Sequence, residues 1–77
     1  MKARISKKAS KEIANLINRI QVGTMMRDEL KRDGNHEGAK VWMLEICRSE
    51  VALADDYGIP VVAVNHAREI LAIADAE

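Results

Sequence analysis

Residues 37–57 read EGAKVWMLEICRSEVALADDY, and their spacing is that of one long helix. At about 100° per residue, the polar side chains fall within an arc of about 120°. These side chains are Glu45, Arg48, Ser49, Asp55 and Asp56. The apolar side chains occupy roughly 200°, nearly twice the stripe that a helix needs when it packs against a single core. We therefore expect this helix to be covered from two sides, with the rest of the chain arranged around it.

Turn-forming residues mark both ends of this helix. The segment from Asp33 to His36 has the composition of a turn, and Asn35 can cap the helix that follows it. Gly58 suits the left-handed residue just past a helix end, and Pro60 cannot continue the same ladder of hydrogen bonds. The sequence thus predicts that the helix stops at the Gly58-Ile59-Pro60 turn.

Glu50 breaks the pattern because it lies near the middle of the apolar arc. An unpaired carboxylate is costly to bury, so it needs a cation, a hydrogen-bonding partner or a route to water. We expect Glu50 to form an ion pair, within the fold or across a contact between subunits. Two alternatives stay open: a carboxylate that faces a ligand in a cleft, or a shift of helical phase near the helix end.

A second helix is predicted over residues 9–32, with Ser6 or Ser10 as its cap. Its apolar stripe changes direction by about 90° at Gly23, and glycine weakens a helix interior. We therefore expect either one bent helix or two short helices that are broken near Gly23. The stripe before the change consists of Ala9, Ile13, Leu16, Ile17 and Ile20.

The segment after Pro60 is predicted to form a third helix, because proline is favoured in a first turn and no second strand is available. The alternative is that Val61–Val64 begins as a strand, since this run is β-prone. The predicted fold is all-α, with a bent first helix antiparallel to a long second helix and a third helix after the turn. Residues 1–8 are expected to form a flexible basic arm, and residues 9–77 a single helical domain.

Composition limits the possible classes of protein. The chain has 77 residues and is 48% apolar, but it has no Phe, one Trp and one Tyr, so its core must be aliphatic. The single Cys excludes an internal disulfide and fits a reducing cytoplasm. No apolar run is long enough for a membrane span or a signal peptide. We expect a soluble, cytoplasmic protein.

Charge is divided between the two parts of the chain, although the net charge is zero. Residues 1–35 contain nine Lys or Arg and four acids, whereas residues 36–77 contain three and eight. This division suits a basic first helix packed on acidic later helices, within a subunit or between subunits.

The predicted second and third helices have wide apolar surfaces. A chain this short has few other residues that could cover them. We therefore expect a homo-oligomer. The leading interpretation is a non-enzymatic binding protein of accessory or inhibitor type. It would contact a protein partner or sequester a small anionic, nucleotide-like ligand. The candidate contact residues are Lys7, Lys8, Lys11, Trp42, Glu50 and Tyr57, with the aromatic rings stacking on the ligand.

Residues 50–69, EVALADDYGIPVVAVNHARE, suggest an alternative function. Small, glycine and apolar residues stand at the positions of a tight helix–helix turn; they are Ala54, Gly58, Ile59 and Val64, followed by Asn65 and Ala67. This stretch resembles the helix-turn-helix of phage Cro-type repressors over 20 of the 77 residues. The resemblance implies a dimeric DNA-binding regulator that contacts the major groove through Asn65, His66 and Arg68.

Catalytic and metal-binding patterns are not found. Cys47 lies on an apolar face with no His at a helical spacing, which favours a structural thiol over a nucleophile. His36, His66 and Cys47 do not have the spacing of a zinc site. Since no glycine-rich phosphate loop or nucleophile elbow is present either, we expect no enzyme, no metal and no cofactor.

Overall fold

The computed structural model describes residues 6–76 and contains three α-helices within them. Helix α1 spans Lys7–Arg32, α2 spans His36–Tyr57 and α3 spans Val64–Ala76, and no strand occurs in the described range. The predicted all-α, three-helix fold is confirmed, and the long central helix has almost the bounds expected for it.

Ser6 sets the start of α1. Its hydroxyl oxygen accepts a hydrogen bond from the backbone N–H of Ala9 at 3.1 Å, which satisfies one of the free donors of the first turn. Lys7 and Lys8 therefore belong to the helix, and the prediction that places them in a flexible arm is wrong. Residues 1–5 of that predicted arm lie outside the described residues.

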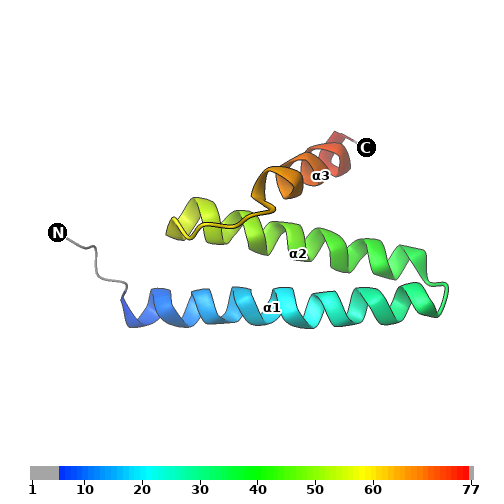
Figure 1. The fold of residues 1–77 in the computed structure, drawn as a ribbon, viewed down its shortest axis with the longest axis horizontal. Coiled ribbons are helices and arrows are strands. Elements are labelled where there is room, and N and C mark those ends of the chain that lie inside the picture. The colour runs from blue at the N-terminus through cyan, green and yellow to red at the C-terminus, as the bar shows by residue number, and fades with distance from the viewer. Residues whose placement is uncertain (1–5, 77) are drawn as a thin grey trace.

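Helix α1 is continuous through Gly23, so the predicted break at this position is wrong. Figure 1 shows no sharp kink there. A Cβ atom added at Gly23 would lie 2.9 Å from Cγ1 of Ile46 and 3.4 Å from the ring of Trp42. The glycine thus allows α2 to approach the backbone of α1 closely, and this approach is the reason for its position in the helix.

The predicted caps of α2 are confirmed. The Asn35 side chain accepts a hydrogen bond from the N–H of Gly38 at 2.9 Å. At the other end, Gly58 has φ 66° and ψ 22°, and its N–H donates to the carbonyl of Ala54 at 3.1 Å. The N–H of Ile59 donates to the carbonyl of Leu53 at 3.0 Å, which completes a Schellman-type end.

The predicted third helix is confirmed, but it begins at Val64 and not in a first turn that contains Pro60. Residues 58–63 instead form an irregular connection in which the carbonyl of Val61 accepts from the N–H of Val64 at 3.2 Å. Branched valine side chains have lower helix propensity than straight-chain residues. The non-helical connection also carries the chain back along α2 before α3 starts, as Figure 1 shows.

The three helices form a layer rather than a closed bundle. Both α1 and α3 pack on α2, but they do not contact each other. Figure 1 shows them side by side, with α2 between the other two. The expectation that the central helix is covered from two sides is confirmed.

The buried core is small and lies mainly in α2. Within the described residues, the side chains with almost no solvent exposure are Ala39, Ile46, Cys47, Ser49 and Leu53 of α2 and Ala67 of α3. Only Ile46 and Leu53 among them are large aliphatic residues. The buried hydroxyl of Ser49 donates to the carbonyl of Glu45 at 2.9 Å, so it is satisfied within its own helix.

Candidate functional site

One side of the layer presents aliphatic side chains from all three helices. A hollow of about 210 Å³ between α2 and α3 is lined by Lys40, Met43, Leu44, Ile70, Ile73 and Ala74. A second hollow of about 210 Å³, between α1 and α2, is lined by Arg27, Lys31, His36, Ala39, Lys40 and Met43. Because the two hollows share Lys40 and Met43, they open on the same side of the molecule.

Helical spacing extends this side along α1. Ile17, Thr24 and Lys31 follow one another at intervals of seven residues, or about two turns, so they lie along one line of the helix. Ile20 is also two turns from Arg27. We define the open face by Ile17 and Ile20 of α1, Met43 of α2, and Ile70 and Ile73 of α3. Two of these side chains are well exposed, Ile17 at 43% and Ile73 at 64%.

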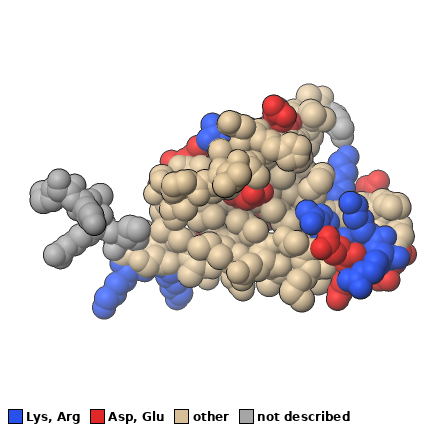
Figure 2. Space-filling view, viewed as in Figure 1, with Lys and Arg blue, Asp and Glu red and all other residues tan. Residues whose placement is uncertain are grey.

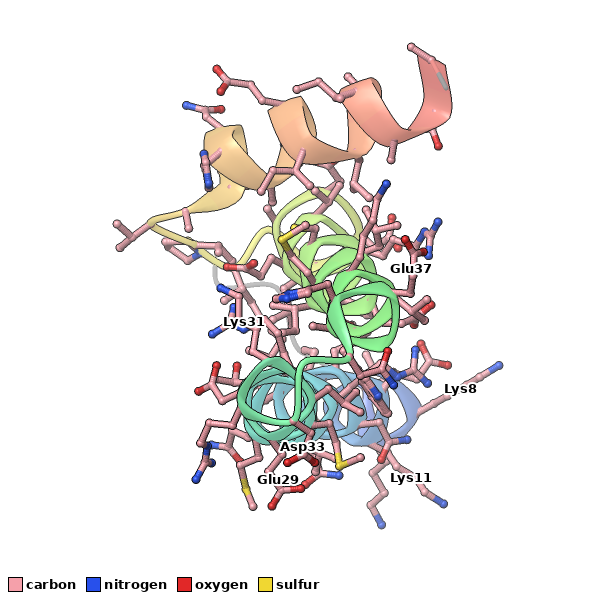
Figure 3. The ribbon with its side chains drawn as sticks, turned by 90° about the vertical axis from the view of Figure 1, so that its right-hand side faces the viewer. Lys8, Lys11, Glu29, Lys31, Asp33 and Glu37 are labelled. Carbon is pink, nitrogen blue, oxygen red and sulfur yellow. The ribbon has the colours of Figure 1, made fainter. Side chains whose placement is uncertain are left out.

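Charge is sparse on the open face. Lys31, which lies on the same line of α1 as Ile17, is on the left in Figure 3. The left-hand side of Figure 3 faces the viewer in Figures 1 and 2, so these two views show the open face. Figure 2 shows that side chains other than Lys, Arg, Asp and Glu dominate the centre of this side over all three helices. Charged side chains gather instead at the end where α1 and α2 are joined. The open face is thus a broad, weakly charged surface with a charged end.

Glu50 is half-buried on this side of α2 and makes no hydrogen bond or ion pair with any residue in the described range. Burial raises the pKa of its carboxyl group, and the charge of His66 on α3 partly opposes that rise. An ion pair within the fold, one of the two pairings expected for Glu50, is therefore not formed within residues 6–76. The carboxylate remains without a partner beside the open face.

Cys47 is buried in the same region of α2. Burial raises the pKa of its thiol, the charge of Glu50 raises it further, and the charge of Arg27 opposes the rise. The thiolate is the reactive form of cysteine, so these surroundings keep the group in its unreactive form at neutral pH.

Trp42 and Tyr57, the expected stacking residues, lie on the other side of the α1–α2 pair. Trp42 lines a hollow of about 340 Å³ together with Asn15, Asn18, Arg19 and Val22. Tyr57 lines one of about 290 Å³ with Glu12, Asn15, Leu16, Arg19, Ala52 and Asp56. The two rings are about 22 Å apart along α2, from the helical rise of 1.5 Å per residue. One small ligand cannot stack on both rings of the same chain.

The Tyr57 hydroxyl donates a hydrogen bond to the carboxylate of Glu12 on α1. This bond, together with burial and the negative charges of Glu12 and Asp56, raises the pKa of the Tyr57 phenol. The contact joins the start of α1 to the end of α2, which gives Tyr57 a structural role in a single chain.

The three N-terminal lysines do not converge on either aromatic ring. Lys7, Lys8 and Lys11 are exposed on the first turns of α1. Figure 3 shows Lys8 and Lys11 pointing away from α2. The residues predicted to contact one ligand are therefore spread over two sides and one end of the chain.

A cluster of cationic side chains at the α1–α2 turn is not predicted by the sequence pattern. We define the basic pocket by the residues that line the second hollow: Arg27, Lys31, His36, Ala39, Lys40 and Met43. The sequence does contain a hint of it, since Arg27 and Lys31 are four residues apart before the turn and His36 and Lys40 are four apart after it. Only the folding of α2 back onto α1 brings the two pairs together.

The predicted DNA-contacting residues lie in the first turns of α3. Asn65 and His66 are exposed, whereas the Arg68 guanidinium forms an exposed ion pair with Asp55 of α2. The connection between α2 and α3 has six residues, 58–63, compared with the roughly 3–4 residues of a typical helix-turn-helix.

Residues 6–76 contain no group of three His, Cys, Asp or Glu side chains that could hold a metal ion. None of the helices in this range combines the length and the apolar character that crossing a bilayer requires. No protein-family model, curated protein or solved structure matches the chain.

Proposed function

We propose that this chain is a non-enzymatic binding protein that works as a homo-oligomer, with the open face of one copy covered by another copy. One observation carries the proposal: α1 and α3 pack on α2 but not on each other. A three-helix bundle closes by a third contact between its outer helices. In this layer the contact is absent, so Ile17, Ile73 and their neighbours stay exposed to water.

The small core gives a physical reason for association. Full burial of a large aliphatic side chain contributes about 1.5–3 kcal/mol, and only Ile46 and Leu53 of this class are buried in the described residues. A domain of this size is marginal when its core is this small. Covering the open face would remove further isoleucine and methionine side chains from water and so stabilise the folded chain.

The side of the layer that carries the open face has dimensions close to those of a standard interface. Helix α1 has 26 residues and is thus about 39 Å long. Packed helices are about 8–10 Å apart, so the three-helix layer is about 25 Å across. The resulting face approaches the roughly 800 Å² per partner that a standard interface buries.

Light scattering coupled to size exclusion tests the proposal on the full chain. We expect a mass above that of the 8.6 kDa monomer and a shift toward monomer in Ile73→Glu. The matched control is Met25→Glu. Met25 is as exposed as Ile73, 66% against 64%, and it points away from α2 because it follows Gly23 by two residues. A monomeric wild-type protein, or equal dissociation in both variants, would contradict the proposal.

DNA binding through α3 is the second candidate function, because the exposure of Asn65 and His66 favours it. Gel-shift measurements on random-sequence duplex DNA at two salt concentrations test it. A shift that weakens with salt and is lost in Asn65→Ala/Arg68→Ala would support the repressor-like function. Retention of the shift in this double variant would exclude α3 as the contact element.

A further inference from the structure

The basic pocket concentrates positive charge at one end of the open face. Its volume is about 210 Å³, and its lining contains three basic side chains: Arg27 and Lys31 of α1 and Lys40 of α2. His36 of α2 also lines it. The lining contains no carboxylate. The basic pocket lies at the first turns of α2, where the positive end of the helix dipole also favours the binding of an anion.

The acids of this end of the molecule are directed elsewhere. Glu29 and Asp33 line a different hollow together with Arg32. Figure 3 shows Lys31 on one side of the hairpin, Glu37 on the opposite side, and Glu29 and Asp33 beneath α1. The basic pocket is therefore a locally positive site in a region that contains many acids.

The carboxylate of Asp28 competes for Arg27. The Arg27 guanidinium donates from Nε and Nη2 to Oδ1 of Asp28, both at 3.2 Å. This pair is exposed to solvent, with 32% of the Arg27 side chain and 52% of the Asp28 side chain accessible. Exposed pairs of this kind are weak, so a more highly charged anion can attract the guanidinium away from Asp28.

We propose that the basic pocket binds the phosphate group of a small organic phosphate. The apolar part of the ligand lies over Met43, in the neighbouring hollow between α2 and α3. Arginine and lysine are the residues that most often bind phosphate in proteins. The thioether of Met43 is flexible enough to fit ligands of different shape.

The geometry supports a ligand of this kind because the two hollows are adjacent. They share Lys40 and Met43, and each has a volume of about 210 Å³. Together they reach the range of roughly 300–1,000 Å³ that is typical of small-molecule sites. One part of the site is cationic and the other is aliphatic, lined by Leu44, Ile70, Ile73 and Ala74.

This inference rests on the proposed role as a binding protein and names the class of ligand. It requires only residues of one chain, but Met43, Ile70 and Ile73 also belong to the open face, so a bound ligand and a second copy would compete for this surface. Association is measured on the ligand-free chain and ligand binding by titration, so each proposal can fail separately.

Calorimetric titration of the full chain at low ionic strength tests the site, with inorganic pyrophosphate and ADP as the probes. We expect both to bind, and ADP to bind more tightly because its base and ribose reach the aliphatic hollow. Lys31→Gln should weaken both by about tenfold, the usual effect of losing a charge-assisted hydrogen bond. Absence of binding by both probes would overturn the inference.

The matched control is Arg32→Gln. Arg32 is the next residue along the chain, and its variant has the same change in net charge, but it lines the hollow that contains Glu29 and Asp33. We expect its affinity for both probes to stay within about twofold of wild type, as for other surface changes that touch no ligand. Equal weakening in the two variants would show that the probes respond only to overall charge and would overturn the inference.

Two further titrations distinguish a small organic phosphate from phosphate on a lipid surface or on a nucleic acid. Vesicles of phosphatidylcholine and phosphatidylglycerol present phosphate at a lipid surface, and duplex DNA presents it on a polymer. Binding to either one without binding to pyrophosphate or ADP would overturn the assignment of a small ligand. Light scattering on the same samples without ligand reports the oligomer. A chain that is monomeric without ligand and binds ADP would support the site and contradict the homo-oligomer.

Discussion

The contact between α1 and α2 differs from the contact between α2 and α3. The first is between helices of 26 and 22 residues connected by a short turn, and Ile46 packs against the backbone of Gly23 in it. The second is between α2 and a helix of 13 residues that follows an irregular connection, and it buries Ala67, which is 1% exposed. Both contacts depend on a small residue, but the first extends over about twice the length. We therefore expect the hairpin to carry the stability and α3 to open more easily.

Gly23→Val is expected to have the largest effect. Its Cβ would lie 2.9 Å from Ile46 Cγ1, an atom near the backbone that cannot move away freely, so the two helices must separate. We expect a loss of about 3 kcal/mol in the free energy of unfolding, measured by urea denaturation. The control Ala14→Val adds the same branched side chain at an exposed position of α1 and should cost only about 0.5 kcal/mol. Equal stability of Gly23→Val and wild type would show that the close approach does not occur.

Ala67→Leu tests the second contact. The larger side chain overpacks a nearly inaccessible position and should cost about 1–3 kcal/mol. Because α3 contacts α2 alone, we expect a local result: faster amide hydrogen exchange in α3 and little change in α1 and α2. Ala72→Leu, at an exposed position of the same helix, is the control. Uniformly faster exchange in all three helices would mean that α3 and the hairpin unfold as one unit.

Glu50→Gln is expected to stabilise the chain. Burial raises the pKa of Glu50 in the folded chain, so the charged form costs stability at neutral pH. This cost disappears as the pH falls below 4.5, the ordinary pKa of a glutamate side chain. The substitution should raise the free energy of unfolding at pH 7 by about 0.5–1 kcal/mol and have little effect near pH 3. Glu69→Gln, at an exposed position of α3, is the control. A loss of stability at pH 7 would indicate that Glu50 has a cationic partner in the working protein, as expected for a pair across a subunit contact.

Arg68→Ala should have the smallest effect. The Arg68–Asp55 pair joins α3 to α2, but both side chains are about half exposed, at 50% and 51%. Exposed ion pairs contribute little, and we expect a change below about 0.5 kcal/mol in thermal unfolding. A larger loss would mean that polar contacts, rather than the packing of Ala67, hold α3 on the hairpin.

Local features of the chain are predictable from its sequence, whereas features that depend on distant residues are not. The caps at Asn35 and Gly58 depend on hydrogen bonds between residues that are close in the chain, and both were predicted. The role of Gly23 depends on Ile46, which belongs to another helix, and the pattern alone left open a break that does not occur. The start of α3 depends on where that helix must meet α2, so it was placed too early.

The candidate site was less predictable than the fold. The pattern identified Glu50 as an exception on an apolar surface, and the structure leaves it without a partner in the described residues. The predicted grouping of lysines with Trp42 and Tyr57 does not form in one chain, because composition gives no direction to a side chain. The basic pocket was missed since its residues come from both sides of a turn and look like ordinary surface charges in each helix.

The amino-acid pattern is enough to show that the chain is helical, where its long helix ends, and that this helix has too much apolar surface for one contact. These properties follow from periodicity and from short-range hydrogen bonds. Three other properties appear only when the helices are packed: the outer helices do not meet, one side of the layer stays open, and cations from two helices share a pocket. Those properties depend on the angles at which helices pack, and the packing angles arise from contacts between residues far apart in the chain.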